Sequence, residues 1–139
     1  MPEEVLPSVE RDEPLLRRFL PDPASSAIPA AAFRPTRNDL TGISVSIERY
    51  PNPIVRVLSD TNRPAACYGV CRFDLAGLTE LSVASSPTAL DPGHATIPEI
   101  CPPYDELAKS DQRRKKIKDW QEALWRRSIV IHRAGDPIV

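Results

Sequence analysis

The sequence predicts an α+β protein in which a small, mostly antiparallel sheet carries one long amphipathic helix near the C-terminus. Two observations lead to this prediction. The chain has 16 prolines and only 5 glycines. Because proline fixes φ and donates no backbone hydrogen bond, it divides regular structure into short pieces joined by proline-rich loops. The exception is the range 104–127, which holds neither residue type and is long enough for a helix.

A chain of 139 residues fits a single domain. Acidic residues and prolines recur in residues 1–14, and such a composition has little to bury. We therefore expect an acidic extended arm over 1–14 and a single α+β domain over 15–139. The net charge of −1 indicates no partner by itself, although basic residues concentrate in 109–127.

The first half of the domain predicts a helix, a loop and a strand. Leu15, Leu16, Phe19 and Leu20 share one face of a two-turn helix over 14–20, which prolines then end. The next segment, 21–42, is rich in small residues and predicts a loop with a short strand near 31–34. Apolar and polar residues alternate through 42–50, which predicts the clearest strand, with one wet face.

The second half predicts shorter elements. Residues 51–60 favour a short helix that begins near Pro53. Residues 65–87 predict two strands with a bend near Gly69, and 86–103 predicts a loop with 95–97 extended.

The end of the chain predicts the long helix and a last strand. Ile117, Trp120 and Leu124 form a helical seam within 104–127. Ser110 and Asp111 are good N-cap residues, so a break there is reasonable. The β-branched residues of 128–133 predict the final strand.

The cysteines Cys67, Cys71 and Cys101 are too few and odd in number for a disulfide framework. Together with His94 they form a conceivable zinc set. However, an extended strand would separate Cys67 from Cys71 by ~13 Å, so we predict no metal and no cofactor. No apolar run is long enough for a membrane span, and residues 1–14 do not resemble a signal peptide. A cytoplasmic protein without membrane contact is the expectation.

His94 lies in the segment Gly93-His94-Ala95, where glycine permits a tight turn. A histidine on an ordered loop is a candidate acid, base or anion contact. The alternative is a loop histidine whose ring bonds a backbone carbonyl.

The range 21–100 contains arginine and no lysine, a bias that can line an anion pocket, although a G- and C-rich genome produces the same bias. The arginines are Arg34, Arg37, Arg49, Arg56, Arg63 and Arg72.

The long helix carries a run of basic residues followed by tryptophan. Basic side chains bind phosphate, and tryptophan stacks on bases. Trp120 belongs to the apolar seam, which leaves Trp125 as the freer ring. A solvated charged face is the alternative. The candidate nucleic-acid contacts are Arg113, Arg114, Lys115, Lys116, Lys118 and Trp125.

Three segments resemble a family of small uncharacterised bacterial proteins. They are LRRFLP at 16–21, AAFRPTRNDLTGISVSIERY at 31–50 and GHATIP at 93–98. The resemblance implies no particular activity. It implies that Arg34, Asp39, Ser44 and His94 belong to one set.

That set is similar to the arrangement in mono-ADP-ribosyltransferase-like folds, where Arg or His and a strand Ser lie beside a nucleotide across a split sheet. Arg34, Ser44 and His94 are therefore the candidate catalytic residues. Glu80 and Glu99 are the nearest choices for an acidic third motif, and neither has a supporting context. The structural alternative is a local Arg34–Asp39 pair with Ser44 facing water.

The leading interpretation is a non-enzymatic accessory or adaptor protein that binds a protein partner in a bacterial multi-gene system, because separated charges suit docking. The first alternative is a nucleotide- or nucleic-acid-handling enzyme that uses Arg34, Ser44 and His94. The second is a nucleic-acid-binding module that uses the basic helix at 113–118. The sequence leaves the oligomeric state and the identity of any partner or substrate open.

Overall fold

A computed structural model describes residues 9–25, 27–35, 42–59, 63–85, 93–100 and 111–138, without the side chains of 85 and 111–114. The predicted α+β class is confirmed. The strands are β1 (Leu15–Phe19), β2 (Ile43–Ile47), β3 (Gly69–Phe73), β4 (Ala84–Ser85), β5 (His94–Ile97) and β6 (Ile129–His132). The helices are η1 (Ala30–Phe33), α1 (Pro53–Val57), η2 (Ala65–Cys67) and α3 (Asp111–Arg127).

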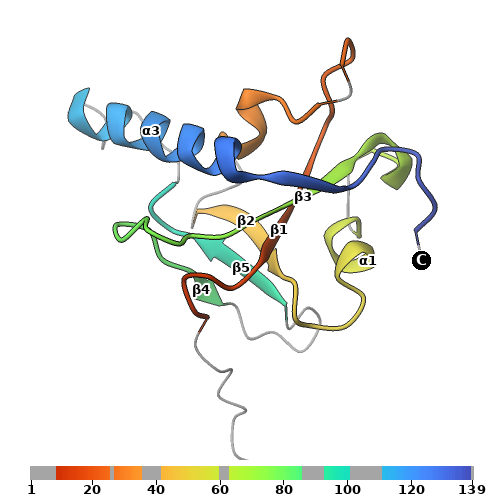
Figure 1. The fold of residues 1–139 in the computed structure, drawn as a ribbon, viewed down its shortest axis with the longest axis horizontal. Helices are drawn as coiled ribbons and strands as arrows, with labels where there is room; N and C mark the ends of the chain where they lie inside the picture. The colour runs from red at the N-terminus through yellow and green to blue at the C-terminus, as the bar shows by residue number, and fades with distance from the viewer. Residues whose placement is uncertain are drawn as a thin grey trace, which may run out of the picture.

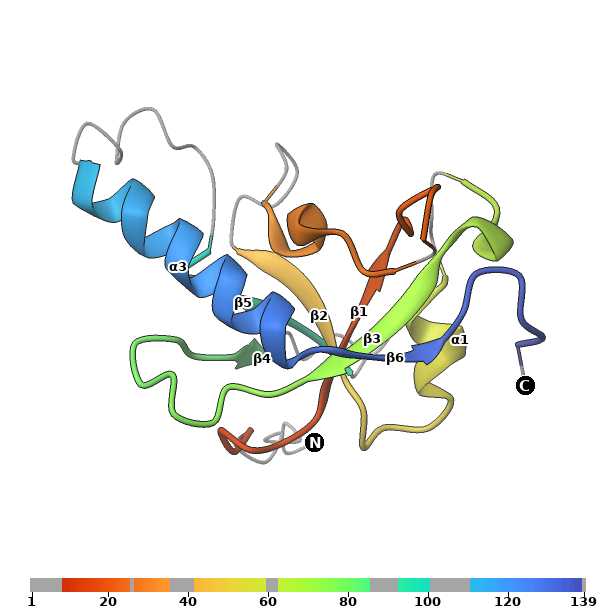
Figure 2. The same cartoon turned by 45° about the horizontal axis from the view of Figure 1, so that its top comes forward.

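The six strands form one antiparallel sheet in the order β4-β5-β2-β1-β3-β6 (Figure 1). Helix α3 crosses one side of this sheet, and α1 lies at its other side (Figure 2). The larger core is buried beneath α3 and includes Phe33, Ile117 and Leu124. A smaller core beneath α1 includes Leu16 and Val70. Apolar burial on both faces fixes the sheet between its helices.

The predicted helix over 14–20 is wrong, because this segment forms strand β1. Leu15 and Phe19 are buried on the α3 face, whereas Leu16 is buried on the α1 face. A central strand that is covered on both faces has no simple alternation of apolar residues. Its short apolar run therefore resembled one face of a helix.

The predicted strand near 31–34 is also wrong, because this segment forms the 3-10 helix η1. Phe33 is fully buried and its ring meets the ring of Phe73 edge-on, with centroids 4.9 Å apart. One helical turn is enough to bury this single large side chain after Pro29.

Strand β2 confirms the prediction for 42–50, although its second face is not fully exposed to solvent. Ser44 is exposed, but Ser46 is buried with only 6% of its surface accessible. Gly42 leads into the strand with φ of +117°, and a side chain there would overlap the backbone of Ile97 and Pro98. The neighbouring strand β5 therefore requires glycine at this position.

The remaining element predictions hold where the structure describes them, with two corrections. His94, predicted on a loop, is the first residue of strand β5, and residues 65–67 form the 3-10 helix η2 before β3. Helix α1 begins at Pro53, and the ladder between β3 and β6 shifts register between Val70 and Cys71, one residue beyond the bend predicted at Gly69. Helix α3 begins at Asp111, and residues 101–110 lie outside the described residues. No helix in the described ranges is long and apolar enough to cross a membrane.

Residues 9–14 lie on the domain rather than apart from it. Val9 packs against the larger core. The Arg11 guanidinium donates to the carbonyls of Leu78, Thr79 and Leu81 at 2.6–3.1 Å, and the backbone N–H of Leu75 donates to the Arg11 carbonyl at 2.9 Å. This part of the segment predicted as an arm therefore closes the loop after β3. Residues 1–8 lie outside the described range.

Candidate functional site

The sheet splits between β1 and β2. These strands pair only at Leu15 with Ile47 and at Leu16 with Ser46. Beyond these pairs β1 continues along β3, while β2 continues along β5. A hollow of about 770 Å³ lies at this opening, and we call it the split hollow. Its lining includes Arg17, Arg18, Arg34, Ser44, Arg56 and His94.

All three candidate catalytic residues from the sequence, Arg34, Ser44 and His94, line the split hollow. Asp39, the fourth member of the set, lies outside the described residues. Among the described residues that line the hollow, none is acidic and four are arginine. The charge of this lining suits an anionic ligand.

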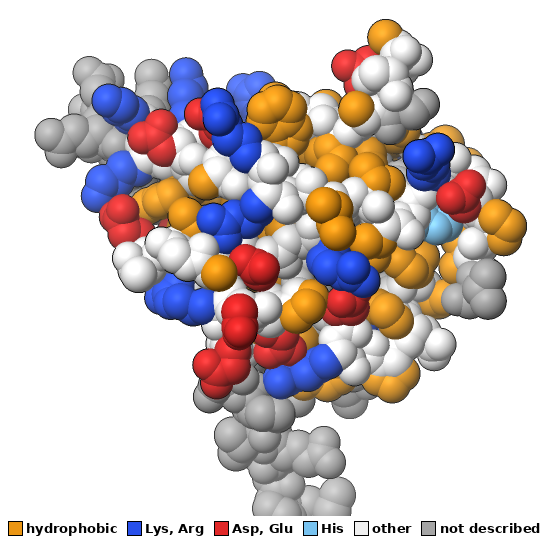
Figure 3. Space-filling model, in the orientation of Figure 1, with side chains coloured by type: hydrophobic (Ala, Val, Ile, Leu, Met, Phe, Trp, Pro, Cys, Tyr) orange, Lys and Arg blue, Asp and Glu red, His pale blue; other side chains and the backbone are white. Residues whose placement is uncertain are grey.

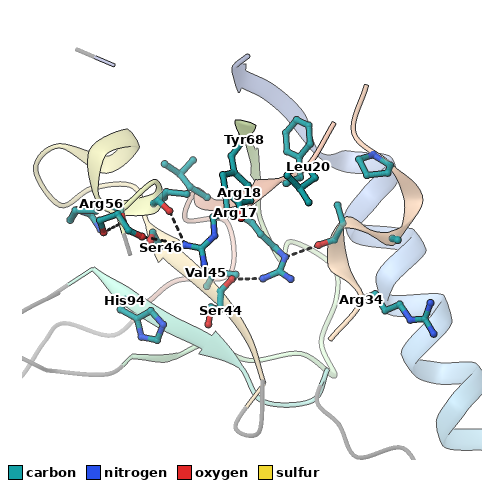
Figure 4. Close-up of a pocket in the computed structure, with 17 residues that line it drawn as sticks. Arg17, Arg18, Leu20, Arg34, Ser44, Val45, Ser46, Arg56, Tyr68 and His94 are labelled. Atoms are coloured by element: carbon teal, nitrogen blue, oxygen red, sulfur yellow. Dashed lines mark hydrogen bonds between the residues drawn. The ribbon is translucent and has the colours of Figure 1, made fainter. Parts of the chain in front are cut away.

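Arg17 takes the place of the missing strand pairing. Its Nη1 donates to the carbonyl of Ser44 on β2 at 2.7 Å, and its Nε donates to the carbonyl of Ala32 on η1 at 2.7 Å. Figure 4 shows this guanidinium between the two carbonyls. One side chain therefore holds η1 and β2 on either side of the opening.

Ser44 and His94 share one face of the sheet. The register pairs Ser46 with His94 and Ser44 with Thr96. Because alternate residues of a strand share a face, Ser44, Ser46 and His94 all point to the α1 side. The His94 ring is half-buried, and no hydrogen bond joins it to another described residue. The alternative of a ring bonded to a backbone carbonyl finds no support in the described contacts.

Arg34 stands apart from that pair. It follows η1 directly, is exposed, and forms no ion pair with a described residue. Figure 4 shows its guanidinium directed toward α3, away from Ser44 and His94. The three candidates therefore line one hollow without converging on one point, and Arg34 faces the end nearest α3.

Arg18 forms the wall opposite His94 together with an aromatic ring. Its Nη1 donates to the carbonyl of Val57 at 3.1 Å, and its Cζ lies 5.7 Å from the centroid of Tyr68. Phe19 and Leu20 also line the hollow, and Leu20 is exposed. This end of the hollow combines a cation with apolar surface.

Arg56 stabilises the backbone at the end of β2, next to the residue that precedes His94. Its guanidinium donates to the carbonyls of Ile47, Tyr50 and Pro51 at 2.8–2.9 Å. The Ile47 N–H in turn donates to the carbonyl of Gly93 at 2.8 Å. The residue before His94 is thereby fixed to the end of β2.

The structure places only some of the arginines of 21–100 in the predicted anion pocket. Of the members of that group that the structure describes, only Arg34 and Arg56 line the split hollow. Arg49 pairs with Glu13 at 3.1 Å, and Arg72 forms a bidentate pair with Glu48. Arg37 lies outside the described residues, and Arg63 is exposed outside the lining.

Sequence reasoning missed Arg17 and Arg18 as members of the site. The signal was the adjacent pair in LRRFLP: in a strand, neighbours point to opposite faces, so consecutive arginines reach both sides of the sheet. Because we predicted a helix over 14–20, we did not expect these two arginines to reach opposite faces of a sheet.

The acidic residues considered for a third motif serve other contacts. Glu80 pairs with Lys116 at 3.1 Å, and Glu99 accepts hydrogen bonds from the backbone and hydroxyl of Ser82 at 2.9 and 2.7 Å. Neither lines the split hollow.

The basic helix is only partly free for a partner. Lys115 and Lys118 are exposed, and Lys116 pairs with Glu80. Trp125 is 36% exposed, and its Nε1 donates to the Ile28 carbonyl at 2.9 Å. Figure 3 shows basic side chains along α3 with acidic ones among them. The side chains of Arg113 and Arg114 lie outside the described set.

The two described cysteines differ in their exposure to solvent. Cys67 is exposed at the end of η2, and Cys71 is buried in β3. Burial raises the pKa of the Cys71 thiol to about 12, so it stays protonated at neutral pH. Within the described ranges, no three His, Cys, Asp or Glu residues gather as metal ligands. Cys101 lies outside those ranges.

No model of a known protein family matches the chain, and neither the curated proteins nor the solved structures compared with it give a significant match. The resemblance of its three segments to small bacterial proteins stays a prediction. The function is therefore argued from the site.

Proposed function

We propose that the protein binds a nucleotide in the split hollow, with Arg34, Ser44 and His94 among its contacts. The supporting observation is the opening between β1 and β2, whose described lining carries four arginines and no acidic residue. Arg17, Arg18 and Arg56 donate to backbone carbonyls, whereas Arg34 is exposed and offers a planar fork that matches phosphate oxygens. A volume of about 770 Å³ falls in the range of small-molecule and cofactor sites.

The two ends of the hollow suit the two parts of a nucleotide. Arg34 is the exposed cation at the α3 end, which suits a phosphate. Tyr68 and Leu20 supply aromatic and apolar surface at the other end, which suits a base. Ser44 and His94 share one face of the sheet, where they are the candidate reactive groups. Histidine and a hydroxyl are suited to proton transfer or to holding a ribose.

Calorimetric titration with ADP and with inorganic pyrophosphate tests the proposal. The variants Arg34→Ala and His94→Ala should each weaken ADP binding roughly 10-fold or more, because a hydrogen bond to a charged group is lost. Lys116→Ala is the matched control: it removes an exposed cation that pairs with Glu80 outside the hollow, and should change affinity less than about twofold. Unchanged ADP binding in an Arg34→Ala, His94→Ala double variant would exclude the site.

A second candidate function is the accessory protein that docks on a protein partner. Strand β6 favours it, because β6 is an edge of the sheet and exposes Ile129 and Val130. An exposed apolar edge strand accepts a strand from another chain. Charged substitution at both positions, Ile129→Glu with Val130→Glu, should leave ADP binding intact and abolish co-purification of a protein partner. A partner that still co-purifies with this variant binds elsewhere.

A further inference from the structure

The split hollow is continuous with one side of α3. Helix α3 packs against η1. The Trp125 indole is bonded to the Ile28 carbonyl at 2.9 Å, and the next residue, Pro29, already lines the hollow. Arg34, at the far end of η1, lines the hollow and points toward α3 (Figure 4). The rim of the hollow therefore leads onto the helix.

This side of α3 carries a cation and an aromatic ring. Lys118 and Trp125 are seven residues apart, so they share one side of the helix and lie about 10 Å apart along its axis. Both are exposed. Lys115 is exposed three residues before Lys118, close enough to be its neighbour on the helix surface. The nearby Glu122 pairs with Arg126 at 2.8 Å, which offsets its charge.

We propose that the ligand is a single-stranded nucleic acid whose terminal nucleotide enters the split hollow, while the adjoining nucleotides lie along Arg34, Trp125 and Lys118. This proposal rests on the proposed nucleotide site. Phosphates contact Arg34 and Lys118, and a base stacks on the Trp125 ring. We call these three residues the α3 track.

The state of Trp125 favours a base over a protein side chain. Its indole N–H is already bonded to the Ile28 carbonyl, so the exposed surface of this residue offers π contact rather than a hydrogen-bond donor. The bond also fixes the ring, so stacking costs little further ordering. An acidic peptide would use Lys118 and Arg34 but would gain nothing specific from this ring. Stacking and backbone charge together are how proteins bind single strands.

The test measures fluorescence anisotropy of labelled oligonucleotides of about eight nucleotides, as RNA and as DNA of one sequence, against ADP. The full chain should bind at least one oligonucleotide 10-fold or more tighter than ADP, with affinity that falls as salt rises. Trp125→Ala and Lys118→Ala should each weaken oligonucleotide binding roughly 5-fold or more and leave ADP binding within about twofold. The RNA and DNA arms identify the sugar that the site accepts.

Matched variants distinguish binding at the α3 track from binding that depends on positive charge alone. Lys116→Ala removes a cation of the same helix that pairs with Glu80 and should leave oligonucleotide affinity within about twofold. Trp125→Phe keeps a stacking ring and should restore most of the affinity lost in Trp125→Ala. A poly-glutamate peptide should compete poorly, and its binding should not respond to Trp125→Ala.

Each contrary outcome has a distinct meaning. If ADP binds in the hollow but oligonucleotides bind no tighter, or if Trp125→Ala and Lys118→Ala bind them like the unaltered protein, the α3 track is overturned and the nucleotide site stands. If neither ADP nor any oligonucleotide binds, both proposals fall. If poly-glutamate binds as tightly as the oligonucleotides, the partner is an acidic protein and the track proposal is wrong.

Discussion

The guanidinium of Arg56 occupies the space that a side chain at residue 93 would need. A Cβ added to Gly93 would lie 1.8 Å from Nη1 of Arg56. This Nη1 is buried, while Nε and Nη2 bond to three backbone carbonyls at the end of β2. The contact joins α1 to the start of β5, where His94 enters the hollow. The position of His94 therefore depends on a close approach between two residues that are far apart in the sequence.

The first prediction is that Gly93 and Arg56 are energetically coupled. Gly93→Ala should lower the free energy of unfolding by about 1–3 kcal/mol, because the added methyl group displaces the guanidinium from its carbonyls. In the Arg56→Ala background the same change should cost at least about 1 kcal/mol less, since the space is then empty. Urea unfolding of the four proteins measures this. Additive effects would show that the overlap is relieved without disturbing Arg56.

The second prediction concerns Arg17 as the bridge across the split. Arg17→Ala should lower the free energy of unfolding by about 2–4 kcal/mol, because two carbonyls lose hydrogen bonds to a charged donor. Arg17→Lys should recover less than half of that loss, since an ammonium lacks the planar fork that reaches Ser44 and Ala32 together. Urea unfolding is the measurement, with the exposed Lys115→Ala as a control of about 0.5 kcal/mol or less. A lysine variant as stable as the original protein would contradict the bridging role.

The class of fold was predictable because its strongest signals are local. The seam of Ile117, Trp120 and Leu124 specifies one buried helix face, and alternation in 42–50 specifies a half-buried strand. Both patterns are periodicities within a short segment, so they can be recognised without knowing which elements pack against that segment. The strand β1 has no such pattern, because helices cover both of its faces.

The site was only partly predictable for a related reason. Arg34, Ser44 and His94 were selected from the sequence, and they line one hollow. Their arrangement depends on where β1 leaves β2, which is a non-local property of strand pairing. Arg17 and Arg18 were missed because their roles exist only once β1 is a central strand beside that opening.

The third prediction concerns Arg11, which holds the loop between β3 and β4 through three carbonyls. Arg11→Ala should lower the free energy of unfolding by about 1.5–3 kcal/mol, because these acceptors lose a charged donor. Glu10→Ala changes an exposed neighbour and should cost about 0.5 kcal/mol or less. Thermal or urea unfolding of both variants measures the difference. Equal stabilities would mean that the Arg11 guanidinium adds nothing to the fold.

The last prediction is a loss of stability at alkaline pH through Cys71. Burial raises the pKa of its thiol to about 12 in the folded protein, whereas the unfolded chain has the ordinary value of about 8.5. Below about pH 8.5 the thiol is protonated in both states and contributes no pH dependence. Above it the unfolded chain releases the proton while the folded protein retains it. The stability should therefore fall as pH rises from about 8.5 to about 12.

The variant Cys67→Ser with Cys101→Ser leaves Cys71 as the single thiol and isolates the effect. Between pH 7.5 and pH 10 its free energy of unfolding should fall by roughly 2 kcal/mol more than that of the same variant with Cys71→Ala, which removes the titrating group but keeps every other one. Urea unfolding at the two pH values gives the difference. A thiol reagent should modify Cys71 at pH 8 only at the rate of unfolding. Rapid modification of the native protein would show that this thiol is accessible, and that burial does not control its ionisation.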